Sequence, residues 1–110
     1  MHVTRERAGA RFTPGAAHHG VRPARLHGRE AGATDHLVVT RSDFAAGASV
    51  DAGPVAGETV HVLLAGVPTI EAAGQRATLS PGDSVCLADR TGRSLQAGSA
   101  PASVLVVRSR

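Results

Sequence analysis

The sequence predicts an all-β domain, an antiparallel sandwich or barrel of short strands. Stretches rich in β-branched residues recur between turn signals, and no stretch has the apolar period of an amphipathic helix. The chain has 110 residues, which is the length of one domain. Its composition, 42% hydrophobic and 19% charged, is typical of a folded globular protein rather than a disordered one.

The predicted strands follow one another from residue 36 onward. The segment ETVHVLL alternates in side-chain character and is rich in β-branched residues, which is a strong strand signal. Glycines and the SPGD sequence at 80–83 mark turns, and residues 41–57 are expected to form turns and a loop. The predicted strands cover residues 36–40, 58–64, 67–72, 75–79, 84–88, 94–97 and 102–107.

The segment before these strands is expected to be an irregular arm over residues 1–34, followed by a barrel over residues 35–110. Prolines and glycines interrupt every periodic pattern in the arm. Half of the twelve arginines precede residue 30, so an arm that binds nucleic acid is one interpretation. A solvated N-terminus is favoured, because the arginines form no continuous run and only Phe12 and Phe44 could stack on bases. We therefore expect no nucleic-acid partner.

The motifs in the strand region resemble those of a small single-domain cupin. Gly47, Glu58 and Gly66 are placed as the opening glycine, the glutamate and the closing glycine of the first cupin motif, and LSPGDSVCLA at 79–88 resembles the second motif. The resemblance covers about residues 36–107. It implies a double-stranded β-helix, or jelly roll, with a small-molecule pocket inside the barrel, and it implies a homodimer.

The same resemblance places metal ligands at positions where this chain has other residues. The paired histidines of the first motif would fall within 51–54, and the third histidine would fall within 90–95, yet none of these residues is histidine. A cupin metal centre uses about three imidazoles and a carboxylate. We therefore predict no metal ligand and no cofactor, although a divalent metal bound by the histidines that precede residue 37 remains an alternative.

Glu58 is the candidate catalytic residue, because the resemblance points it into the barrel mouth. A carboxylate desolvated there would have a raised pKa and could act as a general acid or base; a structural pair with an arginine is the alternative. Asp51, Val60 and Val62 are predicted to contact the substrate. Arg93 lies near the position of the third histidine and could bind a substrate carboxylate or enolate.

Histidine 61 falls on the face of its strand opposite to Glu58, because strand side chains alternate. We expect it to pack between sheets or at a dimer contact, with a catalytic role as the minority interpretation. Cys86 is the only cysteine and is expected in the core, so no disulfide forms within the chain. With no apolar stretch of signal-peptide or membrane-span type, we expect a cytoplasmic protein from a bacterial, GC-rich gene.

Three functions are compatible with this pattern. The first is a metal-independent cupin enzyme that isomerises or cyclises a small polyketide-like or other natural-product intermediate by acid/base chemistry. The second is a non-catalytic cupin that binds or senses a small molecule, which the missing histidines favour. The third is a metal-dependent cupin oxygenase with unusual ligands.

Overall fold

The computed structural model describes residues 1–32 and 34–109, except for the side chain of residue 30, so residue 33 of the predicted arm and residue 110 lie outside the described part. Over these residues the chain is built from β-strands and one short 3-10 turn, η1 (Arg29–Ala31), with no α-helix. None of the helical structure described there has the length and apolarity that a membrane crossing requires. The prediction of an all-β fold is therefore confirmed.

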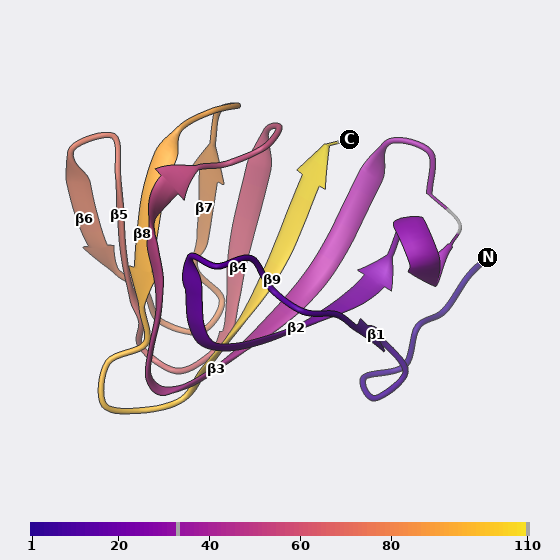
Figure 1. Ribbon diagram of the computed structural model, residues 1–110, viewed down its shortest axis with the longest axis horizontal. Coiled ribbons are helices and arrows are strands. Elements are labelled where there is room, and N and C mark those ends of the chain that lie inside the picture. Colours follow the sequence, from indigo (N-terminus) through magenta and orange to yellow (C-terminus); the bar gives the residue numbers. More distant parts are fainter. Residues whose placement is uncertain (33, 110) are drawn as a thin grey trace.

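The strands form one curled antiparallel sheet in the order β6-β5-β8-β3-β9-β4-β7, with β2 paired to β3 and β1 paired to β2 (Figure 1). Antiparallel pairing leaves one face of each strand for the interior and one for the outside. The strands are β1 (Ala10–Arg11), β2 (His18–His27), β3 (Leu37–Pro54), β4 (Thr59–Ala65), β5 (Thr69–Ala72), β6 (Gln75–Thr78), β7 (Ser84–Leu87), β8 (Gly92–Gln96) and β9 (Ala102–Ser109).

Strand β3 joins the two walls of the half-barrel. Its first half, residues 37–44, pairs with β9, whereas residues 49–54 pair with β8. The strand bends between these halves, where Gly47 adopts a φ of 76°. One wall therefore contains β9, β4 and β7, and the other contains β8, β5 and β6 (Figure 1).

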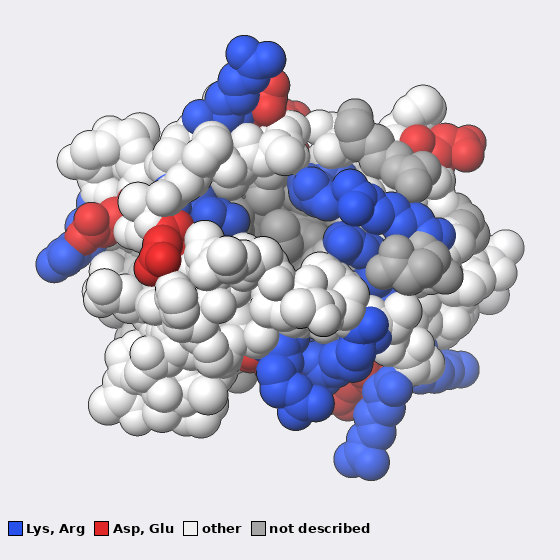
Figure 2. All heavy atoms as spheres, in the orientation of Figure 1, with Lys and Arg blue, Asp and Glu red and all other residues white. Residues whose placement is uncertain are grey.

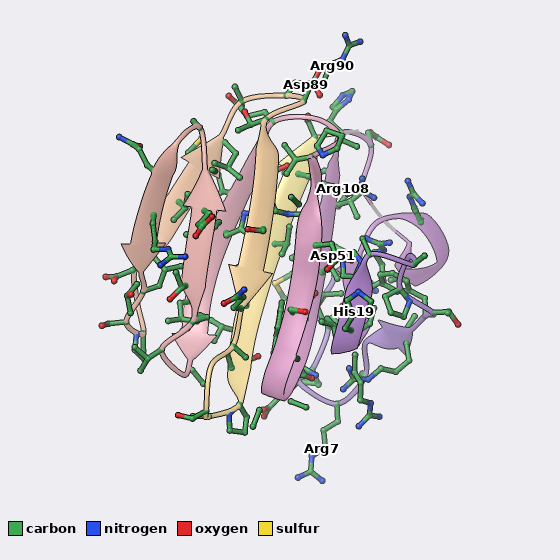
Figure 3. All side chains as sticks on the ribbon, turned by 60° about the vertical axis from the view of Figure 1, so that its left-hand side comes forward. Arg7, His19, Asp51, Asp89, Arg90 and Arg108 are labelled. Atoms are coloured by element: carbon green, nitrogen blue, oxygen red, sulfur yellow. The ribbon has the colours of Figure 1, made fainter. Side chains whose placement is uncertain are left out.

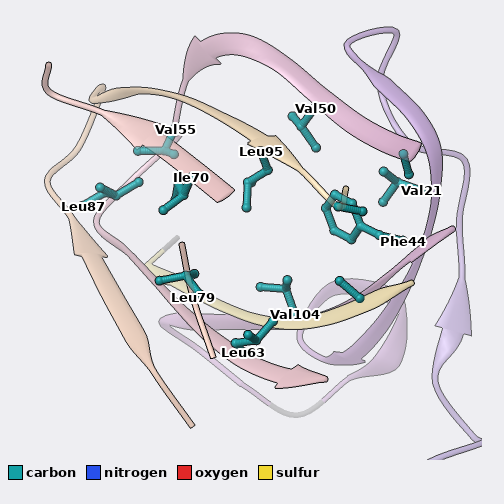
Figure 4. Close-up of a cluster of buried hydrophobic side chains, with 13 residues drawn as sticks. Val21, Phe44, Val50, Val55, Leu63, Ile70, Leu79, Leu87, Leu95 and Val104 are labelled. Carbon is teal, nitrogen blue, oxygen red and sulfur yellow. The ribbon is translucent and has the colours of Figure 1, made fainter. Parts of the chain in front are cut away.

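The core lies between these walls and consists almost entirely of aliphatic side chains (Figure 4). Leu63 and Val104 come from one wall, and Ile70 and Leu95 from the other, each with 3% exposure or less. Phe44 is the aromatic member of the cluster. Full burial of such a side chain stabilises the fold by about 1.5–3 kcal/mol, so many small residues replace the missing aromatics.

Three expectations need correction. Residues 41–54 form most of β3 rather than turns and a loop, because a single strand bends and changes partner there. The arm expected to be irregular contains β2, which pairs with β3 along most of its length. Val21 on β2 is buried in the core. Cys86 is exposed rather than buried, because it lies on the outer face of β7.

Candidate functional site

A cavity of about 290 Å³ opens into the interior of the half-barrel. Strand alternation selects its lining: every second residue of a strand faces inward, as Thr59 and His61 do on β4. The other strand residues that line it are His18, Pro23 and Arg25 on β2, Thr40, Ser42, Phe44, Val50 and Pro54 on β3, Arg93 and Leu95 on β8, and Val104, Val106 and Arg108 on β9. The cavity is therefore part apolar and part cationic.

His61 is the most deeply buried polar side chain of this lining, with 2% exposure. Its strand neighbours are Val106 on β9 and Val85 on β7, both apolar, and its Nδ1 atom has no hydrogen-bond partner in the described structure. Burial, with a smaller contribution from the positive charge of Arg93, lowers the pKa of His61 to about 4. The imidazole is therefore neutral at pH 7 and can accept a proton.

Arg93 reaches the cavity from the opposite wall, where β8 pairs with β3 and β5. Its Nε atom is buried and has no hydrogen-bond partner among the described residues. Burial lowers the pKa of the guanidinium. The pKa of His18 is also lowered, first by burial and then by Arg93, so this one cation acts on both imidazoles of the cavity.

The N-terminal segment covers part of the cavity through Phe12, Pro14 and Gly15. The guanidinium of Arg25 lies 4.4 Å from the centre of the Phe12 ring, within cation–π distance, and donates a hydrogen bond to the Thr40 hydroxyl. These contacts hold Arg25 in place. On the face seen in Figure 2, arginine atoms gather beside a depression in the surface.

The orientation predicted for Glu58 is wrong. Glu58 is exposed and lies outside the cavity, whereas its neighbour Thr59 is buried and faces the interior. Val60 and Val62 share the outward face with Glu58 and do not line the cavity either. Both faces of this strand carry aliphatic residues, so the alternating pattern by itself does not say which face is inside. Arg93 alone among the predicted site residues lines the cavity.

Asp51 also lies outside the cavity, where its Oδ2 atom is 2.9 Å from Nε2 of His19 (Figure 3). Both side chains are more than half exposed. His18 and His19 are neighbours on β2 and therefore point to opposite faces, one into the cavity and one out to Asp51. His2 and His27 meet elsewhere, edge to face at 5.4 Å between ring centroids.

Sequence reasoning considered His18 only among the histidines of an alternative metal site, and it favoured a packing role for His61. His18 lies at the end of β2 that pairs with the second half of β3, and His61 lies on β4 beside β9. Both line the cavity because the sheet curls, a neighbourhood that local spacing does not encode. A signal for His61 was nevertheless present. It is the one ionisable residue on the inner face of its strand, between Thr59 and Leu63.

Sequence and structure comparisons with known proteins show what this chain is similar to. No family model matches the sequence. The chain is 37% identical over 95 residues to the β-D-galactosidase Rv1717 of Mycobacterium tuberculosis, covering 86% of this chain and 81% of that protein. An RmlC-like cupin from Shewanella frigidimarina superposes with a TM-score of 0.81 over 99% of this chain and 90% of that one, at 16% identity. This chain belongs to the same family as that galactosidase and has the cupin fold.

A second solved structure has a similar fold. The polyketide cyclase RemF from Streptomyces resistomycificus superposes with a TM-score of 0.86, covering 99% of this chain and 79% of that one. The two sequences are 16% identical, so the likeness establishes the shared fold. The coverage includes the N-terminal segment, which agrees with β2 being part of the cupin sheet.

The side chains of this cupin do not fit the metal centre that the family implies. That centre needs about three imidazoles and a carboxylate, whereas the cavity has His18 and His61 together with the guanidinium groups of arginines. In the part of the chain that the structure describes, no three His, Cys, Asp or Glu residues come close enough to hold a metal ion. Guanidinium groups also repel a cation. We therefore derive no chemical step through a metal.

Proposed function

We propose that this cupin is a metal-independent enzyme that isomerises or cyclises a small organic molecule by acid/base chemistry in the barrel cavity. One observation carries the proposal: His61, whose buried Nδ1 atom has no hydrogen-bond partner in the described structure, lines a cavity that Arg93 also lines. A neutral imidazole can take a proton from a carbon beside a carbonyl group. The guanidinium can stabilise the oxyanion that then develops.

Binding of the substrate would raise the pKa of the His61 imidazole and make it a stronger base. An imidazole with a pKa of about 4 is a weak base, and part of that lowering comes from the Arg93 charge. A negatively charged substrate group beside Arg93 would offset that charge and raise the pKa of His61 toward the working pH. The likeness in fold to a polyketide cyclase supports polyketide-like intermediates as one substrate class.

Hydrolysis of a β-D-galactoside is the second candidate, and the relative named β-D-galactosidase favours it. Most glycosidases use two carboxylates on either side of the scissile bond. No carboxylate of the described residues lines this cavity, so an imidazole would have to transfer the proton instead. A galactoside is therefore one of the substrates in the activity test that follows.

Turnover in the His61→Gln variant tests the proposed function. We expect the variant to lose about a hundredfold in rate, because the proton-transfer group is removed while the volume of the side chain is nearly kept. Proton exchange from small carbonyl compounds in D₂O, followed by NMR, and release of nitrophenol from 4-nitrophenyl β-D-galactoside are the two readouts.

The Glu58→Gln variant is the matched control, since Glu58 lies outside the cavity. It should retain the parent rate within about twofold. Equal rates for the His61→Gln variant and the parent would overturn the acid/base role. A parent protein that binds a small molecule with no turnover of any substrate would instead identify a binding cupin.

We also propose a homodimer formed through the outer face of the β9–β4 pair. Val60 lies opposite Val107, and Val62 lies opposite Leu105, so aliphatic side chains cover two neighbouring strands on the outside. Leu64 extends this face and is 46% exposed. A second copy would bury the same surface on both partners.

Light scattering measures the dimer directly. The parent should have about twice the 11.2 kDa mass of the chain, and Val62→Glu should reduce it to a single chain by placing a charge in the interface. Gln75→Glu, a change on the exposed strand β6, should leave the mass unchanged. A parent mass of 11.2 kDa would overturn the dimer.

A further inference from the structure

The charges that line the cavity are all of one sign among the described residues. Three arginines line it, Arg25, Arg93 and Arg108, together with two histidines, and none of the described aspartates or glutamates does. Exposed carboxylates elsewhere pair with other cations: Asp43 with Arg11, Glu71 with Arg76 and Asp51 with His19. No described carboxylate pairs with Arg93 or Arg108, so these two arginines give the cavity a positive charge.

Arg93 and Arg108 are the cavity arginines for which the described residues supply no ion pair, and Arg93 is the more deeply buried of the two. Arg25 is held by the Phe12 ring and by the Thr40 hydroxyl, and these contacts give it a structural role. Arg93 is half-buried, its Nε atom has no hydrogen-bond partner, and no described carboxylate lies within ion-pair distance of it. Burying a charged group without a partner costs free energy, so a ligand that supplies the partner would be bound strongly.

We propose that Arg93, with the imidazoles of His18 and His61 beside it, binds a carboxylate group of the ligand, so that the natural ligand is a small organic acid. This inference rests on the proposed function, since it assigns the substrate class of the same cavity. The guanidinium is planar and presents parallel N–H donors that match a carboxylate, whereas a neutral hydroxyl or carbonyl group would leave its charge unpaired. Each neutral imidazole can donate one further hydrogen bond.

The other lining residues indicate the size and polarity of the rest of this acid. Phe44, Val50, Leu95 and Val104 supply an apolar surface beside the cationic group. The volume of about 290 Å³ is at the small end of ligand pockets, which suits a single ring or a short chain. A small acid with one ring and one carboxylate fits both the shape and the charge.

Two matched ligand pairs test the carboxylate. D-galacturonate and D-galactose share a sugar ring, and the carboxylate of the first is a hydroxymethyl group in the second. Benzoate and benzamide share an apolar ring, and the carboxylate of the first is a neutral amide in the second. Calorimetry at pH 7.5 should show at least one acid binding no less than tenfold more tightly than its neutral partner. Arg93→Gln should abolish this preference, because the charge that selects the carboxylate is gone. Arg90→Gln, which changes an exposed arginine of the neighbouring turn, should retain it.

The thermal midpoint gives a second readout that does not depend on turnover. Arg93→Gln should melt no lower than the parent, since it removes a buried cation that no described carboxylate pairs with. The acid should raise the midpoint of the parent and leave that of Arg93→Gln unchanged. A variant that retains the preference for the acid, a neutral ligand that binds as tightly as its acid, or no binding of either acid would overturn the inference. Inorganic phosphate binding more tightly than both acids would overturn the carboxylate in favour of another oxyanion.

The outcomes separate this inference from the proposed function. If acid binding depends on Arg93 while no substrate is turned over, the carboxylate site stands and the acid/base enzyme fails. If His61→Gln abolishes turnover of a neutral substrate and no acid is preferred, the enzyme stands and the carboxylate site fails.

Discussion

Replacing Gly66 with alanine should destabilise the fold by about 3 kcal/mol or more, among the largest effects of any single methyl group in this chain. Gly66 follows β4 with a φ of 89°, a conformation that L side chains rarely adopt. A Cβ atom there would lie 2.5 Å from the Pro101 carbonyl oxygen and 2.8 Å from the Ala102 Cα atom. Both contacts are with backbone at the start of β9, and Ala102 belongs to the core, so neither can move aside cheaply.

Chemical denaturation measures this effect, and Gly74→Ala is its matched control. Gly74 has a similar φ of 74°, yet a Cβ atom there would meet nothing within 4 Å. The control should lose only about 1 kcal/mol, the cost of backbone strain alone. Equal losses in the two variants would mean that the close approach of β4 to β9 contributes nothing.

The fold was predictable because many local signals agreed. Turn sequences such as SPGD at 80–83 and β-branched stretches such as 102–107 require no tertiary information, and their order matched the cupin pattern. The full length of strand β2 was not predicted, because its partner β3 is distant in the sequence and because its own sequence carries a proline and a glycine at positions that pairing tolerates. The bend of β3 at Gly47 was not predicted, because a glycine in a sequence is equally consistent with the end of a strand.

The site was harder to predict because a shift of one residue along a strand decides which side chains face the cavity. Glu58 and Thr59 are adjacent, and only the packed structure shows that Thr59 faces the cavity. Arg93 was predicted because the second motif places the third histidine near it, and the structure brings it to the cavity lining. The neutral character of His61 depends on burial and on a cation from the other wall, and neither is a property of its own strand.

Acidification from pH 7.5 to 4.5 should lower the free energy of unfolding by about 2.5 kcal/mol through His61 alone. Above pH 6.5 the imidazole is neutral in the folded and the unfolded chain, so it adds no pH dependence. Below pH 6.5 the His61 imidazole of the unfolded chain takes up a proton, whereas in the folded chain it stays neutral until the pH approaches its pKa of about 4. Stability contributed by the neutral imidazole is therefore lost as the pH falls through this window.

Urea denaturation across pH 7.5 to 4.5 measures this loss, and comparison with His61→Gln assigns it. Glutamine does not titrate, so the free energy of unfolding of the variant should fall by about 2.5 kcal/mol less than that of the parent over that range. A smaller slope should remain, because burial and the Arg93 charge also lower the pKa of His18. His36→Gln, which removes an exposed imidazole, should follow the parent. Parallel curves for His61→Gln and the parent would mean that His61 is solvated in the folded chain, and they would remove the neutral base on which the proposed chemistry depends.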